Sequence, residues 1–152
     1  MSYQLQQVNW LKNRERLKAL REKVFVCEYH IPKHIEFDQL DRTSQHIVLL
    51  NEQNIIIASA RLSEDGLMSR VAVLPEFRTE DIYQNLFSYL VSVAKEQGAT
   101  EMSFNCILHE KDKFLKAGFF SKGPVFMEAG IARQRLCCPI ESFTTSEFSL
   151  VH

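Results

Sequence analysis

The chain has 152 residues, 18 of them basic and 19 acidic, for a formal net charge of −1. Such a balance gives no reason to expect nucleic acid or an anionic membrane as a partner. No apolar run approaches the roughly 20 residues that span a bilayer, and the N-terminal segment lacks the apolar stretch of a secretory signal. The four cysteines, two of them adjacent, suggest no disulfide framework. We therefore expect a cytoplasmic protein with reduced thiols.

The first half of the chain predicts a strand, a helix, a long loop and a three-stranded meander. Apolar residues recur at helical spacing from Trp10 to near Glu28, with charged residues between them; this pattern is typical of an amphipathic helix. The polar segment that follows is acidic in its second half and predicts a functional or covering loop. The expected ranges are a strand over 3–8, a helix over 10–28, a loop over 29–45, and strands over 46–51, 55–62 and 67–74.

The second half begins with the longest helical pattern, which Thr79 opens and Gly98 closes. It continues with a strand over 101–105, a short helix over 110–117, strands over 119–121 and 133–138, and an aperiodic tail. This order predicts an α/β or α+β fold, with a mixed sheet and helices on its faces. We expect one domain over residues 1–138 and a C-terminal tail over 139–152.

The segment 70–87 runs from an apolar strand through a short turn into a helix N-terminus. Such a junction commonly holds a phosphate, because free backbone N–H groups and the helix dipole favour an anion there. The turn then usually carries glycines, which let the amides close on the ligand. Here it carries Glu80 and Asp81 and no glycine.

Eight collinear words over roughly residues 20–136 resemble the GNAT acetyltransferase superfamily, and within it the ElaA-like branch. The words are REKVFVCE (21–28), EFDQLD (36–41), QHIV (45–48), ARL (60–62), RVAVLPEFR (70–78), FN (104–105), FLKAGF (114–119) and GPVFMEAGI (123–131). The resemblance implies a mixed, mostly antiparallel sheet with helices on both faces. It also implies a splayed central strand pair, which here is formed by residues 70–74 and 101–105.

By this resemblance, acetyl-CoA is the cosubstrate and lies across the splayed strand pair. Its pantetheine would pair with the backbone of Val71, Ala72 and Val73 as an added strand does. The other positions that the resemblance assigns to the cofactor are Arg78 and Thr79 near the phosphates, Asn105 at the CoA arm and Phe114 on the following short helix.

The chain departs from the family pattern at the phosphate turn and at the expected proton donor. Asp81 and Tyr83 stand where the family has small residues, and Thr79 replaces a frequent glycine. Even half of the nominal repulsion from one carboxylate, roughly 2 kcal/mol, would weaken acyl-CoA binding about thirtyfold. Asp81 alternatively serves the helix itself, by satisfying its free N–H groups. Phe114 takes the place of a tyrosine that would protonate the departing thiolate, and a phenyl ring has no proton to give.

Glu28 and His46 are the candidate catalytic residues, because either could accept a proton from an attacking amine. Their structural alternatives are a packed helix end for Glu28 and a hydrogen-bonded strand residue for His46. The acidic residues of the long loop would favour a cationic amine acceptor if they face the site, and are otherwise a solvated loop. These residues are Glu36, Asp38 and Asp41.

Two further constellations lack the groups that their chemistry requires. Cys27, His30 and His34 have metal-capable side chains at short spacing, but no second Cys/His pair supplies a fourth ligand, so no metal is expected. Cys106 and His109 could form a nucleophile pair, yet no third group supports them.

The leading hypothesis is an N-acyltransferase that moves an acetyl group from acetyl-CoA to a primary amine of a small molecule or peptide by direct attack. The alternative is a catalytically impaired GNAT fold, kept as a ligand-binding or regulatory module. A homodimer is left open in both cases. The degenerate phosphate turn and Phe114 favour the alternative, whereas the intact word 70–78 and Asn105 favour the enzyme.

Overall fold

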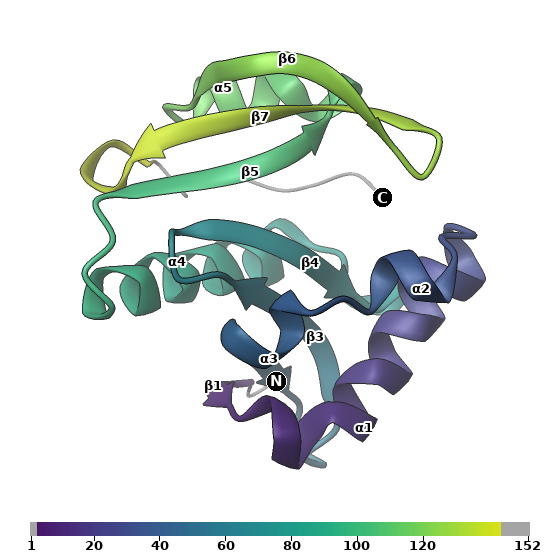
Figure 1. The fold of residues 1–152 in the computed structure, drawn as a ribbon. Coiled ribbons are helices and arrows are strands. Elements are labelled where there is room, and N and C mark those ends of the chain that lie inside the picture. The colour runs from purple at the N-terminus through teal and green to yellow at the C-terminus, as the bar shows by residue number, and fades with distance from the viewer. Residues whose placement is uncertain (1–2, 144–152) are drawn as a thin grey trace. The chain divides into compact units, whose positions relative to one another are not determined.

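The computed structural model describes residues 3–143, and its elements alternate along the chain as Figure 1 shows. The strands are β1 (Gln4–Val8), β2 (Gln45–Leu50), β3 (Ile56–Leu62), β4 (Leu67–Val73), β5 (Glu101–Ile107), β6 (Phe120–Glu128) and β7 (Ile131–Pro139). The α-helices are α1 (Trp10–Arg21), α2 (Lys33–Glu36), α3 (Leu40–Thr43), α4 (Glu80–Glu96) and α5 (Lys111–Lys116). A π-helix, η1 (Glu22–Glu28), and 3₁₀ segments η2 (Pro75–Phe77), η3 (Leu108–Glu110) and η4 (Ile140–Ser142) complete the set.

The strands form one seven-stranded sheet in the order β1-β2-β3-β4-β5-β7-β6. β4 and β5 pair in parallel, whereas β1–β2, β2–β3, β5–β7 and β6–β7 are antiparallel. The predicted mixed, mostly antiparallel fold is therefore confirmed. The register between β4 and β5 consists of Leu67 opposite Ser103 and Met68 opposite Phe104. Gly66 enables this approach, since a Cβ on it would lie 2.3 Å from the carbonyl oxygen of Glu101.

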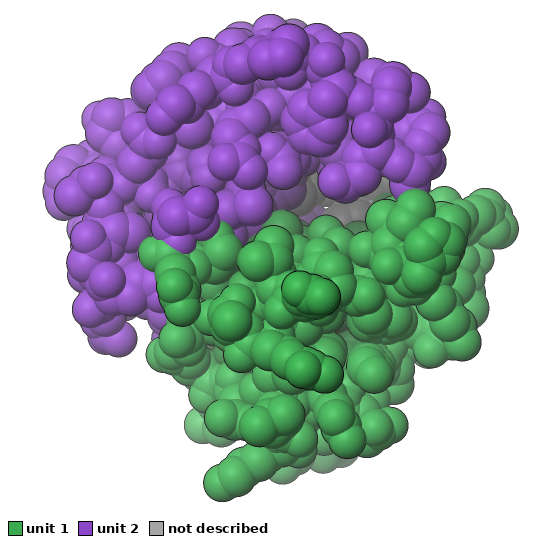
Figure 2. Space-filling view, viewed as in Figure 1, with its two compact units in different colours: residues 1–64, 69–78 green, residues 65–68, 79–152 purple. Residues whose placement is uncertain are grey.

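The chain divides into two compact units, residues 1–64 with 69–78 and residues 65–68 with 79–152 (Figure 2). In the first unit, helix α1 and segment η1 pack on the sheet. Their buried residues are Trp10, Leu17, Leu20 and Val24, and the sheet contributes Val48, Leu50, Ile56 and Ala72 to the same cluster. The predicted amphipathic helix thus buries its apolar face, as its spacing requires.

In the second unit, α4 buries one face along its 17 residues, from Ile82 and Tyr83 to Val93 and Ala94. A chain of aromatic rings extends this core: Phe104 stacks on Phe114, Phe114 meets Phe119 edge-on, and Phe143 contacts both Phe119 and Phe87. The start of the predicted tail therefore packs in this unit. The remainder of the tail, residues 144–152, lies outside the described residues, and the predicted domain limit at residue 138 stays a prediction.

Three predicted elements differ in extent from the observed ones. The helix expected to reach Glu28 is α-helical to Arg21 and continues as the π-helix η1. The expected loop 29–45 contains the short helices α2 and α3. Strand β6 runs to Glu128, well beyond the predicted 119–121, because a register shift between Ser121 and Val125 accommodates its Gly-Pro pair at the sheet edge.

Six charged side chains of the first unit form a connected network that ties the segment 29–45 to α1, β3 and β4. Its members are Arg21, Glu36, Asp38, Asp41, Arg61 and Arg70. Arg21 donates to Glu36 at 2.8 Å and to Asp41 at 2.7 Å, and all three side chains are at most 2% exposed. Because the three positive and three negative charges balance, none of the buried ions is left uncompensated.

Burial and ion pairing act differently on the two most buried carboxyls. At Asp41 burial is the largest single influence and would raise the pKa, but hydrogen bonds and charges of Arg21 and Arg61 together hold it below its ordinary value. At Glu36 burial raises the pKa, and the charges of Arg70, Arg21 and Arg61 offset it only in part. Asp41 is therefore the carboxylate that the network stabilises most clearly as an anion.

Replacing Asp41 by alanine should destabilise the protein severely, because Arg21 and Arg61 would keep buried charges with one partner removed. We expect a loss of about 3–5 kcal/mol in the free energy of unfolding, measured by urea denaturation. The matched control is Glu22→Ala, which removes an exposed ion pair with Lys33 and should change the stability little, because solvent screens such a pair. Equal losses in the two variants would contradict the assigned importance of the network.

Candidate functional site

Strand β4 changes its backbone conformation at Arg70, whose φ of +52° lies in the left-handed region. A non-glycine residue seldom adopts this conformation, so surrounding contacts must hold it. Here the Arg70 guanidinium donates to the carbonyl oxygens of Ile35 and Glu36 and to the Asp38 carboxylate, at 3.0–3.1 Å. Val71, Ala72 and Val73, the residues predicted to pair with the pantetheine, follow directly on the same strand.

Arg78 and Glu28, which the sequence assigns to different tasks, are bound to each other. The two terminal nitrogens of Arg78 donate to the two carboxylate oxygens of Glu28, each at 2.7 Å. Its Nε donates to the carbonyl oxygen of Val73 at 2.9 Å. The guanidinium thus fixes the carboxyl end of β4 to the end of η1. A phosphate contact by Arg78, or proton uptake by Glu28, would compete with this bidentate pair.

The start of α4 is satisfied by its own residues. The Oγ1 atom of Thr79 accepts a hydrogen bond from the backbone N–H of Ile82 at 3.3 Å, which makes Thr79 the N-cap. Glu80 and Asp81 are exposed in the first turn, where carboxylates complement the helix dipole. Tyr83 is only 1% exposed. Its ring belongs to the core, although Tyr83 stands where the family has a small residue.

Asn105 and Phe114 lie on opposite sides of the second unit's strands. The side-chain oxygen of Asn105, on β5, accepts a hydrogen bond from Nε of Arg135 at 3.0 Å. Phe114, on α5, is fully buried, with its ring 4.8 Å from that of Phe104. Burial favours a packing role for Phe114 over contact with a cofactor. Its assignment to the cofactor, like that of Asn105, stays a prediction.

His46 is 1% exposed on β2, and its ring stacks on Trp10 at 4.9 Å. Its Nε2 lies 2.7 Å from the carbonyl oxygen of Asp41. A carbonyl only accepts, so this nitrogen carries the proton and the ring is held in one neutral form. Burial is the main cause that lowers the pKa of His46 from its ordinary value of 6.5, and the hydrogen bond to Asp41 opposes it. These contacts favour a structural role, and general-base catalysis by His46 stays a prediction.

The acidic loop residues are not a free anionic surface. Asp38 and Asp41 both accept from Arg61, at 2.6 and 3.0 Å, and Glu36 pairs with Arg21. Arginines thus engage all three carboxylates within the fold, and the burial of Glu36 and Asp41 excludes a solvated loop at these two residues. That the acidic residues attract a cationic acceptor stays a prediction. Among residues 3–143, no three His, Cys, Asp or Glu side chains are grouped so as to hold a metal ion.

The cysteines of the two predicted constellations, Cys27 and Cys106, differ in their exposure to solvent. Cys27 is exposed, whereas Cys106 is buried, and burial raises the pKa of the Cys106 thiol. A raised pKa keeps a thiol protonated, which is the opposite of what a nucleophile requires. Over the same described residues, no helix has the length and apolar character of a membrane span.

A family model described as "Acetyltransferase (GNAT) domain" matches residues 3–136. This chain therefore belongs to the GNAT acetyltransferase family. It is 29% identical over 126 residues to the uncharacterized N-acetyltransferase YjcF of Bacillus subtilis, and the match covers 79% of this chain and 90% of YjcF. Proteins with the GNAT fold bind acyl-CoA and act on amine acceptors.

Solved structures share the fold at lower sequence identity. The crystal structure of Escherichia coli ElaA superimposes with a TM-score of 0.76 at 22% identity, over 91% of this chain and 99% of ElaA. A proposed N-acetyltransferase of Lactobacillus plantarum gives a TM-score of 0.79, also at 22% identity, over 92% of this chain and 99% of that chain. The ElaA-like resemblance seen in the sequence words is thus confirmed at the level of fold.

Of the arginines discussed, Arg78 is predicted from the sequence, whereas Arg70, Arg133 and Arg135 are not. Arg70 stands at the start of an apolar strand, and Arg133 and Arg135 belong to the last predicted strand. A signal was available, because an arginine within an otherwise apolar strand is seldom buried without a partner. What the sequence does not supply is the identity of that partner: Arg21 and Arg61 both pair with Asp41, 20 positions away in each case.

Stability should depend on pH through His46. The folded pKa lies below the unfolded one, so the unfolded chain binds more protons in the window just below pH 6.5, and the free energy of unfolding rises as pH increases through that window. We expect His46→Gln to lose this contribution, whereas His109→Gln, at an exposed histidine, keeps it. Urea denaturation from about pH 5 to 7 measures both. Identical pH dependence in wild type and His46→Gln would be incompatible with a buried neutral imidazole.

Proposed function

We propose that the protein is an N-acyltransferase that transfers an acyl group, with acetyl as the expected one, from acyl-CoA to a primary amine. The observation that carries the proposal is the conformation of β4. The left-handed backbone at Arg70 interrupts the regular strand conformation directly before Val71, Ala72 and Val73. A strand interrupted in this way can present backbone groups to an extended ligand that adds as a further strand, and the pantetheine arm of acyl-CoA has the amides to pair with it.

The reaction follows by direct attack. The amine nitrogen forms a bond to the thioester carbonyl carbon, the carbon–sulfur bond breaks, and the thiolate leaves with the electron pair. One proton must leave the nitrogen and one must reach the sulfur. Glu28 is better placed than His46 to take the first, because 32% of its side chain is exposed and can exchange protons with solvent. Phe114 cannot supply the second, so water or the proton released by the amine does so.

Phosphate recognition requires a rearrangement in this proposal. Arg78 would exchange the Glu28 carboxylate for a phosphate oxygen while its Nε stays on the Val73 carbonyl. The same exchange would free Glu28 to act as the base. Thr79 would face the pyrophosphate from the start of α4, where Glu80 and Asp81 reduce the attraction for anions. We therefore expect acyl-CoA to bind more weakly than it would to a turn with small, uncharged residues.

The second candidate is a catalytically impaired GNAT fold that acts as a binding or regulatory module. Three observations favour it: the acidic first turn of α4, the complete burial of Phe114, and the engagement of Glu28 by Arg78. In that case the protein would bind acyl-CoA or another ligand at the same strand without turnover, and a homodimer is an assembly open to it.

Calorimetric titration with acetyl-CoA and detection of released thiol in the presence of a panel of primary amines together test the proposal. We expect binding, and thiol release that depends on the amine. Asp81→Asn should tighten acetyl-CoA binding about tenfold, equal to roughly 1.4 kcal/mol, because it removes a repulsive charge at the phosphates. Glu96→Gln removes a charge at the opposite end of the same helix and should leave the affinity unchanged.

The outcomes separate the two candidates. Binding without thiol release for any amine would favour the impaired module. The absence of binding at millimolar acetyl-CoA, in wild type and in Asp81→Asn alike, would contradict the enzyme and leave the impaired module only with a ligand other than acetyl-CoA. Tyr83→Gly is unsuitable as a probe, because Tyr83 is buried and its truncation would cost about 3–5 kcal/mol of stability.

A further inference from the structure

Strand β7 presents two arginines beside Asn105. In the antiparallel register, Arg135 lies opposite Asn105 and Arg133 lies opposite Ile107. Residues two apart on a strand point to the same face, so these two arginines share a face with Asn105. The neighbouring residue Phe104 packs on Phe114 of α5. The arginines therefore lie on the face of the second unit's strands that is opposite to α5.

Both guanidinium groups are fixed by the same residue. Nε of Arg135 donates to the side-chain oxygen of Asn105 at 3.0 Å, and Nη1 of Arg133 donates to its backbone oxygen at 3.1 Å. These bonds orient the two forks but neutralise neither charge. Because the side chains are already oriented, less conformational entropy is lost when an anion binds to them.

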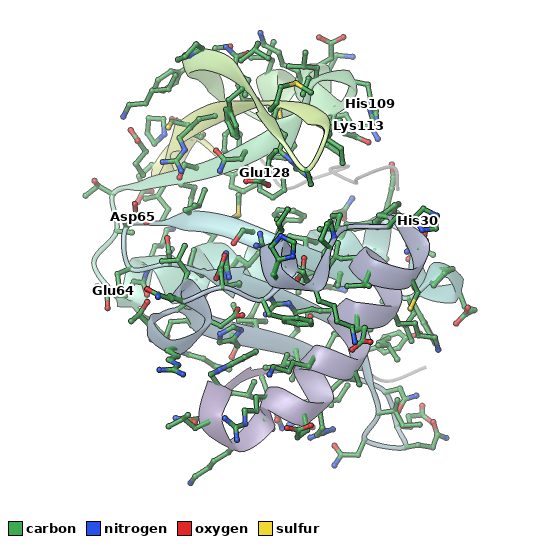
Figure 3. The ribbon with its side chains drawn as sticks, turned by 45° about the vertical axis from the view of Figure 1, so that its right-hand side comes forward. His30, Glu64, Asp65, His109, Lys113 and Glu128 are labelled. Carbon is green, nitrogen blue, oxygen red and sulfur yellow. The ribbon has the colours of Figure 1, made fainter. Side chains whose placement is uncertain are left out.

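The charge of this face is only partly compensated. Nε of Arg133 is buried without a hydrogen bond and lies 3.5 Å from a carboxylate oxygen of Glu128, which ends β6 and is labelled in Figure 3. For Arg135, the part of the chain from residue 3 to 143 supplies no carboxylate at ion-pair distance. Lys122, the cation of the adjacent strand β6, already pairs with Glu101. A half-buried guanidinium of this kind is a favourable place for a carboxylate, which its fork binds with two hydrogen bonds.

We infer that Arg135, assisted by Arg133, binds a carboxylate of the amine acceptor, so that the acceptor is an amino acid or another amine that carries a carboxylate. The inference rests on the proposed function and names its substrate class. Asn105 links the two arginines to the proposed cofactor site. The resemblance assigns Asn105 to the CoA arm, whereas it assigns the phosphates to Arg78 and Thr79. An anion beside Asn105 therefore belongs to the acceptor.

The test compares acetyl transfer to an amino acid with transfer to its primary amide, which has the same side chain and no carboxylate. Alanine and alaninamide are one such pair. We expect wild type to prefer the acid in kcat/KM, and Arg135→Gln, which keeps a donor for Asn105, to reduce this preference about 10- to 100-fold. Lys122→Gln, at a cation of the neighbouring strand, should keep the wild-type preference. Thermal denaturation checks that each variant is folded.

Each outcome decides the inference. A wild-type enzyme that prefers the amide, or an acid-over-amide ratio unchanged in Arg135→Gln, would overturn it while leaving acyl transfer intact. A rise in KM for acetyl-CoA at an unchanged ratio would mean that the arginines meet a phosphate of CoA, which also overturns it. If no amine is acetylated, the proposed function fails separately, and calorimetric binding of N-acetylalanine against N-acetylalaninamide still tests the carboxylate site. Equal affinities there would contradict it.

Discussion

The buried ion network of the first unit is the constraint on which the candidate site depends. Arg21, Arg61 and Arg70 reach from α1, β3 and β4 to the carboxylates of the intervening segment 29–45. Buried charges are costly unless they are paired and hydrogen-bonded, so these three elements can pack only in an arrangement that brings the partners together. The network also binds Arg70 in a left-handed conformation that its side chain alone would not favour.

The consequence of that conformation appears in the next three residues. A regular strand would continue unchanged through Arg70, whereas the left-handed residue interrupts it directly before Val71, Ala72 and Val73. The local strain at Arg70 is thus offset by hydrogen bonds to Ile35, Glu36 and Asp38, which lie more than 30 residues earlier in the chain. A segment that is distant in sequence thus holds β4, the strand to which the proposed function assigns the acyl-CoA arm.

The fold could be predicted from the sequence because periodicity and capping residues act locally. The helix opened by Thr79 and the meander from β2 to β4 follow from residues that are neighbours in the chain. The ion network could not be predicted in this way, since the sequence EFDQLD does not show whether its carboxylates are solvated or buried. Its arginines nevertheless stand in the words REKVFVCE, ARL and RVAVLPEFR, which carry the family resemblance. The most recognisable letters of the sequence are thus also the residues that hold the first unit together.

For the candidate site, the sequence proposes residues but does not give their partners or their burial. Glu28 and Arg78 were assigned separate roles, and the structure joins them in one bidentate pair. Tyr83 stands where the family has a small residue, and its ring lies in the core. Side-chain direction and partner choice depend on packing across the whole unit, which a single sequence does not specify. The balance of charge shows the same limit: arginines neutralise the acidic segment, whereas no carboxylate within residues 3–143 lies at ion-pair distance from Arg135.

The central claim is that the backbone of Val71, Ala72 and Val73 receives the acyl-CoA arm. Hydrogen exchange of the backbone amides, followed with and without saturating acetyl-CoA, tests it most directly, because newly bonded strand amides exchange more slowly. The account predicts that exchange slows at residues 71–73 and at the start of α4. Unchanged exchange at these positions, with acetyl-CoA demonstrably bound, would contradict it.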